Sequence, residues 1–403
     1  MDDRYDKEKL HRDKEENEFM DVFWIKDVAE TIVADLVQWS NDEIYSRLGG
    51  ELRCVLPLSE EVNARAFVDP GDPYNPRIEL YMGMVREIYR DSFVFPVLAD
   101  KIASGPDYID HLKAEFSDVA SFFDGGVPSI PASQHTNIYK SIKNKIVKER
   151  VHPGIPENAL ACRFLMFEVM LAWVFFHELS HLVQRHYLLR SGSETPEALE
   201  AESYEMTKVE CVGEECVRFQ AREVLADVEG GEFTVRYLLR KKMFHFSSVY
   251  LLLCAQYCMF NRFYKGYESN LEFVNARHPH PVVRNELTSQ FVTEYVVFCL
   301  VNMQGSISRS EIVRAVAYLD VKSSLLSGLY WGNRYEKMDG SLTSFMSLSI
   351  GEHTEKRNEY CAVLRRAMFE QLEVIKENHM HRHNFTDFIG VLNFFNRATK
   401  ENK

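Results

Sequence analysis

The sequence contains no Cys-x-x-Cys pair, although it has eight cysteines. This absence excludes a zinc ribbon and a thioredoxin-like redox motif. Most of the cysteines stand in apolar surroundings without regular spacing, which indicates reduced thiols in a cytosolic protein. No internal repeat is visible either.

Basic residues are in the minority. There are 47 Lys and Arg against 60 Asp and Glu, a net charge of -13. A surface that binds nucleic acid needs a basic face, so we expect no nucleic-acid partner. The apolar content of 46% and charged content of 27% are those of an ordinary globular protein.

The sequence also lacks an uninterrupted apolar run of the roughly 20 residues that span a membrane. Residues 159–176 are interrupted by Arg163 and Glu168, and residues 246–260 are too short. We expect both to be core helices of a cytoplasmic protein that makes no membrane contact. Residues 1–18 carry dense charge of both signs, which argues against a targeting peptide and predicts a frayed or disordered leader.

The order of patterns along the chain predicts a mainly α fold with a small β-sheet, an α+β class. Strand character is confined to residues 51–68 and to the start of 77–90, and the segment DPGDPYNP between them is dense in turn-forming residues. Residues 305–403 have apolar residues near the helical period. We therefore expect a leader at 1–18, a main domain at 19–304 and a helical C-terminal region at 305–403.

One motif places ionisable residues inside an apolar helix. VFFHELSHLVQRH contains His177, Glu178 and His181 in the pattern HExxH. Residues four apart share one helix face, so both imidazoles can reach one Zn²⁺ at about 2.0–2.1 Å. Glu178 follows the first ligand and can act as general base toward a water. A chance match is the alternative, but unpaired His and Glu on so apolar a helix would be costly.

A catalytic zinc needs a third protein ligand. The extended motif HExxHxxGxxH fails, because Gln184 and Tyr187 occupy its last two defined positions, and His186 is expected to point away from the ligand face. QAREVLADVEGGEF offers Glu223 as the third ligand, with Asp227 one turn later to fix the tautomer of a ligand histidine. Several nearby glutamates compete for this role, and most of them lie in the polar insertion, where we expect solvated charge: Glu202, Glu205, Glu210, Glu214, Glu215 and Glu229.

Two further stretches of the chain are rich in histidine. ARHPHPVVRNEL reads either as a helix N-terminus with Arg284 in a surface pair, or as a cleft wall on which His278 or His280 binds an oxyanion. Alternate positions on a helix do not share a face. We therefore expect the histidines of HMHRH to be exposed and to bind no metal: His379, His381 and His383.

These segments follow one another in a familiar order: VNARAFVDP, RIELYMGMVREI, HELSH, EVLAD and HPHPVVR. The chain resembles the M48-type gluzincin metallopeptidases, which include CAAX-prenyl proteases and the HtpX heat-shock protease. Because it lacks membrane spans, it is more similar to the soluble Lit-like phage-exclusion peptidases (peptidase U49). The long acidic insertion between His181 and Glu223 and the last hundred residues depart from that pattern.

The resemblance implies a role for each matching residue. His177, His181 and Glu223 are the zinc ligands, Glu178 is the general base and Asp227 is the supporting acid. Asn63 lies near the edge strand that pairs with substrate, and His278 and Arg284 line the cleft. The implied fold has a zincin-like HExxH helix at its core, with the sheet edging the active-site cleft.

We therefore expect a zinc-dependent endopeptidase that cleaves a cytosolic protein or peptide, in phage defence, under the control of a phage or host activator. Residues 305–403 are the expected region for target recognition. One alternative is a regulatory protease that cuts a repressor. The other is a non-catalytic helical interaction protein with a vestigial metal site, which predicts a fourth protein ligand.

Overall fold

The computed structural model describes residues 22–69, 71–103, 128, 130–149, 157–189, 202–203, 213–263, 278–303, 307–334 and 354–381. The predicted leader at 1–18 lies outside these residues, as do Glu205, Glu210 and His383. The longer helices are α2 (Val22–Ser40), α3 (Met82–Ala103), α5 (Asn137–Glu149), α6 (Glu157–Val183), α7 (Glu214–Arg240), α8 (Phe246–Arg262), α9 (Pro281–Met303), α10 (Arg309–Arg334) and α12 (Thr354–Asn378). Short helical turns are η1 (Asn41–Tyr45), η2 (Ser46–Leu48), η4 (Ala132–Gln134) and η5 (His186–Leu189). The prediction of a mainly α protein with a small sheet is confirmed.

Helix α6 is the centre of the molecule. From Leu160 to Val183 nearly every side chain is buried, because the helix is apolar on all sides and neighbours surround it. Among the described residues it is the one helix long and apolar enough to cross a membrane, yet 89% of its most apolar window is buried inside the protein. As predicted, α6 and the equally buried α8 are core helices.

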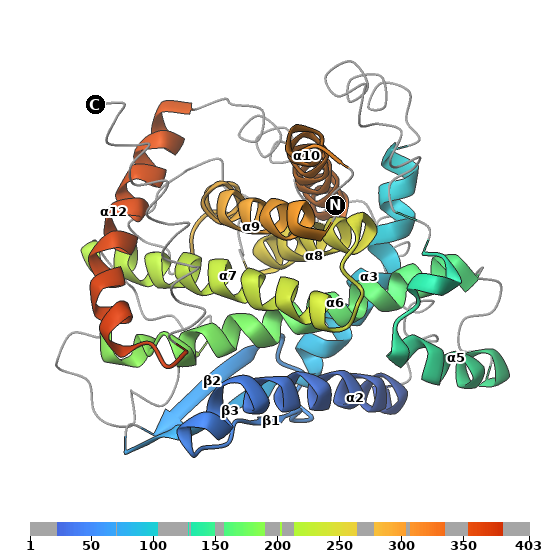
Figure 1. Ribbon diagram of the computed structural model, residues 1–403, viewed down its shortest axis with the longest axis horizontal. Coiled ribbons are helices and arrows are strands. Elements are labelled where there is room, and N and C mark those ends of the chain that lie inside the picture. The colour runs from blue at the N-terminus through green and yellow to red at the C-terminus, as the bar shows by residue number, and fades with distance from the viewer. Residues whose placement is uncertain are drawn as a thin grey trace, which may run out of the picture.

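Helices α7, α8, α3 and α2 pack around α6, and α9 and α10 lie beyond α7 and α8 (Figure 1). Helix α12 crosses one end of this stack, where it contacts α7, α9 and η5. One apolar cluster unites residues from α2 to α10, including Ile312 and Trp331. A second joins α7 and α9 to α12, through residues such as Leu225, Leu287 and Leu364. Both clusters extend past the predicted domain limit at residue 304.

The sheet has four strands in the order β1-β3-β2-β4: β1 (Arg53–Val55), β2 (Ala64–Asp69), β3 (Asp72–Leu80) and β4 (Glu202–Ser203). Strands β2 and β3 form an antiparallel hairpin, β1 runs parallel to β3, and β4 pairs antiparallel with β2. Both strands of the hairpin pack against α6. The acidic insertion thus contributes a strand to the sheet.

The predicted turn DPGDPYNP is much shorter than expected. Strand β3 begins at Asp72, and the Asp69 side chain accepts a 2.8 Å hydrogen bond from the Gly71 backbone N–H. The prolines of this segment are tolerated because β1 pairs only with residues 77–79 of β3.

The cysteines are free thiols at six described positions: Cys54, Cys162, Cys254, Cys258, Cys299 and Cys361. Cys216, at the start of α7, is disulfide-bonded. The expectation of reduced thiols throughout is therefore wrong at this position, for which the sequence spacing gave no signal.

Candidate metal centre

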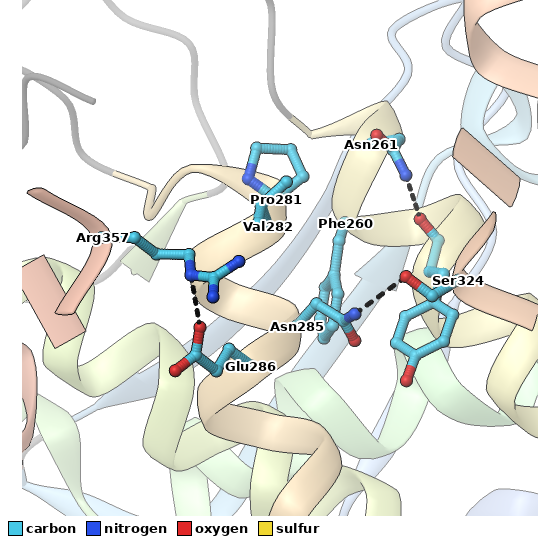
Figure 2. Close-up of a pocket in the computed structure, with 9 residues that line it drawn as sticks. Phe260, Asn261, Pro281, Val282, Asn285, Glu286, Ser324 and Arg357 are labelled. Atoms are coloured by element: carbon cyan, nitrogen blue, oxygen red, sulfur yellow. Dashed lines mark hydrogen bonds and ion pairs between the residues drawn. The ribbon is translucent and has the colours of Figure 1, made fainter. Parts of the chain in front are cut away.

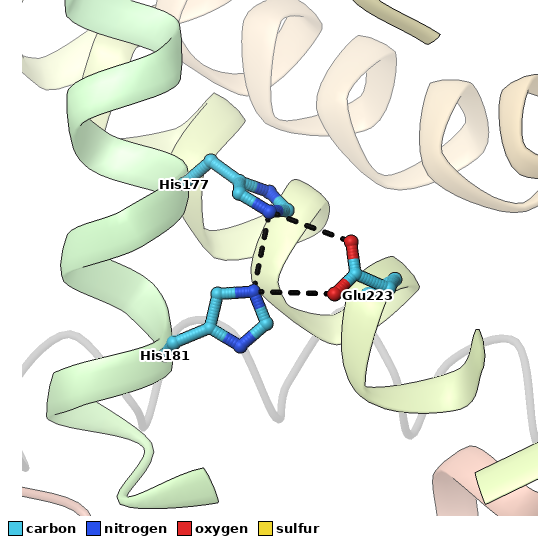
Figure 3. Close-up of side chains that lie close together, drawn as sticks. All are labelled: His177, His181 and Glu223. Carbon is cyan, nitrogen blue, oxygen red and sulfur yellow. Dashed lines mark hydrogen bonds and ion pairs between the residues drawn. The ribbon is translucent and has the colours of Figure 1, made fainter. Parts of the chain in front are cut away.

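Helices α6 and α7 bring the three predicted ligands together (Figure 3). His177 and His181 lie one turn apart on α6, with their Nε2 atoms 3.2 Å from each other. Glu223 extends from α7, with one carboxylate oxygen 3.5 Å from Nε2 of His177 and the other 3.6 Å from Nε2 of His181. In the part of the chain that the structure describes, these three residues form the group that could hold a metal ion.

The spacing of the three side chains fits a tetrahedral metal. Two ligands at about 2.0–2.1 Å from a tetrahedral zinc lie about 3.3–3.4 Å from each other. The two Nε2 atoms are 3.2 Å apart, close to one edge of such a tetrahedron, and each lies 3.5–3.6 Å from a different oxygen of the Glu223 carboxylate. A single divalent cation can therefore bind all three side chains with small adjustments, and no fourth protein ligand joins the group among the described residues.

Asp227 fixes the orientation of His177. Its Oδ1 lies 2.8 Å from Nδ1 of His177, so Nδ1 carries a proton and Nε2 is left to face the metal position. Burial alone would lower the pKa of His177. The hydrogen bonds and negative charges of Asp227 and Glu223 outweigh it and raise that pKa to about 9. Without a metal, the cluster therefore holds a proton where the cation would sit.

Arg284 ties the two carboxylates together. It donates to Asp227 through Nε at 2.6 Å and Nη2 at 2.8 Å, and Nη2 also lies 3.3 Å from Glu223. Its side chain is fully buried. It therefore supports the acidic side chains of the site, and it is neither the surface pair nor the cleft-lining residue that the sequence suggested.

His278 is the histidine of the HPH stretch that reaches the site. Its Nδ1 lies 3.2 Å from Oε2 of Glu223. Burial would raise the pKa of Glu223, but His278, His177 and His181 bring it well below its usual value. His280 is buried at the start of α9, where its Nδ1 accepts a hydrogen bond from the Val282 backbone N–H. The helix N-terminus predicted here is present, because α9 begins at Pro281.

The cluster is closed except on one side. The side chains of His177 and His181 are 1% and 4% exposed, whereas those of Glu223 and His278 are 14% and 17% exposed. Among the described residues, a small molecule or peptide would approach from the Glu223 and His278 side.

Glu178 follows the ligand His177 on α6 and is within electrostatic reach of the sheet. Burial raises the pKa of the Cys54 thiol on β1, and the negative charges of Glu79 and Glu178 raise it further. Glu178 is thus within electrostatic reach of Cys54, although α6 and β1 are distant in sequence. Its own side chain is fully buried.

Asn63 stands immediately before β2 and has a local role. Its side-chain oxygen lies 3.0 Å from the Ala64 backbone N–H, and its backbone oxygen accepts from Tyr81 at 3.2 Å. The side chain is buried and holds the start of the strand. A contact with substrate stays a prediction.

The structure adds four residues that sequence reasoning placed elsewhere. His186 lies 2.8 Å from His181, because the left-handed φ of 51° at Arg185 turns the chain back after α6. Glu229, one of the competing glutamates, and His379, expected to be exposed, are both buried and lie 2.9 Å apart. His381, also expected to be exposed, is buried as well. The expectation was wrong for these two histidines because it treated HMHRH as an isolated straight helix.

The decisive observation is that His177, His181 and Glu223 come together in a group that could hold a metal ion. No family model, curated protein or solved structure matches the chain. What the site can do follows from its donor set. Two imidazoles and a carboxylate suit zinc, with one coordination position left open to a substrate or water.

A separate cavity of about 270 Å³ lies between α8, α9, α10 and α12 (Figure 2). None of the predicted site residues lines it. Its walls are joined by the ion pair of Arg357 with Glu286 and the hydrogen bond of Asn285 with Ser324. It touches the metal centre only indirectly, because Phe260 in its wall lies 4.9 Å from the guanidinium of Arg284.

Proposed function

We propose that the chain is a zinc-dependent endopeptidase of the gluzincin type. The observation that carries this proposal is the combination of an HExxH helix with a glutamate from a second helix in one group that could hold a metal ion. Asp227 and Arg284 support it, because they hold His177 and Glu223 in the required orientation. Two histidines and one glutamate are the ligand set of catalytic zinc sites in peptidases.

The residues around the cluster match the needs of amide hydrolysis. A bound zinc ion is a Lewis acid that polarises a carbonyl group and makes water acidic at neutral pH. Glu178 is fully buried next to the ligand His177, and its carboxylate can take a proton from the attacking water and deliver it to the leaving amine. His278 is partly exposed at the opening, and with a second proton on Nε2 its ring can donate to the developing oxyanion while Nδ1 keeps its bond to Glu223.

The absence of a fourth ligand among the described residues supports a catalytic over a structural metal. Structural zinc sites are closed by four protein ligands, whereas catalytic sites keep one position open. The number of protein ligands therefore distinguishes a peptidase from a helical interaction protein with a vestigial metal site.

An extended peptide is the substrate that suits the sheet beside α6. Substrate backbone can add to a sheet edge as an extra strand. Strand β2 packs against α6, and β4 covers its outer edge opposite Arg65 and Ala66. We infer that access to this edge requires displacement of β4. This agrees with an enzyme that stays quiet in the cytoplasm until a phage or host activator appears.

The resemblance to the Lit-like peptidases supplies the biological part of the proposal. The target would be a cytosolic protein, cleaved as part of phage exclusion. That part rests on the ordered motifs VNARAF, HELSH, EVLAD and HPHPVVR.

The test compares metal content and cleavage in three proteins purified without added metal. Wild type is expected to hold one zinc per chain by mass spectrometry, and Glu223→Ala much less. Glu178→Gln is expected to keep the zinc, because Glu178 is no ligand, and to lose cleavage of unfolded protein substrates. Full cleavage by Glu178→Gln with zinc bound would refute the mechanism. Wild type without zinc would refute the metallopeptidase and favour the interaction protein.

A further inference from the structure

A row of buried polar side chains leads away from the metal ligand His181. Helix α6 ends at Val183, and Arg185 adopts a left-handed backbone conformation. The reversed chain carries His186 back over the helix end, where its Nδ1 lies 2.8 Å from Nδ1 of His181. His186 is fully buried.

The row continues through Gln184 to α7. Nε2 of His186 lies 2.7 Å from Oε1 of Gln184, and Nε2 of Gln184 donates to Oε2 of Glu229 at 2.7 Å. The same amide nitrogen also donates to the Leu225 backbone oxygen at 3.0 Å. Gln184 and Glu229 are each 1% exposed, so water does not replace these bonds.

The row ends in the segment that follows α12. Oε1 of Glu229 lies 2.9 Å from Nε2 of His379, and Nδ1 of His379 accepts a 3.0 Å hydrogen bond from the His381 backbone N–H. The backbone N–H of Met380 donates to the Val183 oxygen at 2.9 Å. Residues 379–381 therefore close over the end of the HExxH helix.

With His186 neutral, the hydrogen bonds of this row run in one direction. A backbone N–H donates, so Nδ1 of His379 is an acceptor and its Nε2 must donate to the Glu229 carboxylate. The Gln184 amide nitrogen donates to Glu229, so its oxygen accepts from Nε2 of His186. Nδ1 of the neutral His186 is then an acceptor.

This direction decides the tautomer of His181. Its Nδ1 then donates to His186, and its Nε2 lone pair points toward His177 and the metal position. Nδ1 of His177 is held by Asp227 in the same way, so the two Nε2 atoms face each other across 3.2 Å, where a cation can replace the proton between them. Such an arrangement is stable when a cation lies between the two nitrogens.

We propose that His186, Gln184, Glu229 and His379 are positioning residues of the metal centre, which hold His181 in its metal-binding tautomer. The inference rests on the proposed zinc site and extends it to the C-terminal segment. Residues 379–381 lie in the region expected to recognise the target, so a partner that displaces them would loosen one zinc ligand.

The test is the affinity for zinc, measured by competition with a chromophoric chelator, together with the visible spectrum of the cobalt-substituted full-length protein. His379→Phe removes both ring nitrogens at nearly constant volume, four hydrogen bonds away from the metal. It is expected to weaken zinc binding about tenfold or more, as outer partners of ligands do, and to change the cobalt bands. His379→Gln keeps a donor for Glu229 and an acceptor for His381, and is expected to restore most of the affinity.

The matched control is His135→Phe. His135 is also buried, and its Nε2 lies 3.2 Å from the Ile130 backbone oxygen, outside the row. Glu229→Gln is a second, isosteric variant in case His379→Phe does not fold, and it should weaken zinc binding in the same direction. Unchanged affinity and spectrum in the His379 and Glu229 variants, or an equal loss in His135→Phe, would overturn the inference while the zinc site stands. Wild type that binds no zinc would overturn both.

Discussion

Gly230 of α7 lies directly against the backbone of His177 of α6. A Cβ atom at position 230 would meet the His177 nitrogen at 2.9 Å and its Cα at 3.0 Å. Glu223 and Asp227 precede Gly230 by seven and three residues, so all three lie on one face of α7. The missing side chain therefore lets α7 approach α6 until both carboxylates reach His177.

We expect Gly230→Ala to separate the two helices. Backbone atoms cannot move aside as a flexible side chain can, so the free energy of unfolding should fall by about 1–3 kcal/mol, as in other overpacked cores. Zinc affinity should fall as well, because Glu223 is drawn away from His177. Chemical denaturation and chelator competition measure the two effects.

Gly231→Ala is the matched control for this variant. A Cβ there would meet Cγ2 of Val292 at 2.6 Å, which is the end of a side chain on α9 and not the backbone of α6. Its zinc affinity should stay near that of wild type. If Gly230→Ala also binds zinc like wild type, close approach at this glycine does not set the ligand geometry.

Arg284→Met should be among the most destabilising substitutions in the protein. It removes a two-point partner from Asp227, and both side chains are fully buried. An uncompensated buried charge of this kind costs about 3–5 kcal/mol of folding free energy. Urea denaturation of the single and double variants with Asp227→Asn gives the coupling energy, which should be clearly non-additive.

Arg357→Met is the control for Arg284→Met, because it removes the arginine of a partly exposed ion pair. Arg357 is 18% and Glu286 27% exposed, and their atoms are 3.1 Å apart. The expected loss is about 1 kcal/mol or less. Equal losses for Arg284→Met and Arg357→Met would show that the buried network contributes no more than a surface pair.

The sequence predicted the three residues of the group that could hold a metal ion because much of their geometry is local. HELSH fixes two histidines on one turn of helix, and the spacing of Glu223 and Asp227 repeats that geometry on α7. Sequence reasoning missed His186, Glu229 and His379 because their positions depend on a chain reversal at Arg185 and on where the segment after α12 packs. Two sequence features pointed to these contacts. The adjacent glycines of VEGGEF inside a helix indicate a close helix contact, and the histidines of HMHRH are candidates for buried hydrogen bonds.

The fold too was predictable where local sequence decides it and unpredictable where tertiary contacts do. Apolar periodicity predicted the core helices α6 and α8, since burial follows directly from composition. It could not predict that β4 would come from the acidic insertion, because strand pairing across more than a hundred residues is set by tertiary contacts.

Prolines at both positions of β4 should raise peptidase activity. Proline cannot donate to a strand ladder, so Glu202→Pro with Ser203→Pro would release this strand from Arg65 and Ala66 of β2. If substrate adds to that edge, cleavage of an unfolded protein should accelerate several-fold, while zinc content stays the same. The same pair of prolines on the Glu178→Gln background should show no cleavage. Unchanged activity in the first variant would mean that β4 does not obstruct the substrate.

Glu168 makes the stability of α6 depend on pH. Burial raises its pKa to about 7 from 4.5, against smaller lowering effects of Tyr237 and Lys241. Oε1 lies 2.9 Å from the Tyr237 hydroxyl, which lies 2.9 Å from Asp35 as well. One phenol hydrogen serves one acceptor, so a protonated Glu168 that donates to Tyr237 completes both bonds. The folded protein therefore retains a proton on Glu168 that the unfolded chain releases above pH 4.5.

This preference sets the sign of the pH dependence. Between about pH 4.5 and 7 the folded state binds more protons at Glu168, so its contribution is complete below pH 4.5 and is lost as the pH rises toward 7. The loss is about 3 kcal/mol, from a shift of two to three pKa units. Glu168→Gln stays neutral and does not lose this contribution. The difference in unfolding free energy between Glu168→Gln and wild type should therefore shift by about 3 kcal/mol in favour of the variant between pH 4.5 and 7. Glu43→Gln, which alters an exposed pair with Arg47, should run parallel to wild type. A parallel curve for Glu168→Gln as well would show that Glu168 is ionised in the folded protein at all of these pH values.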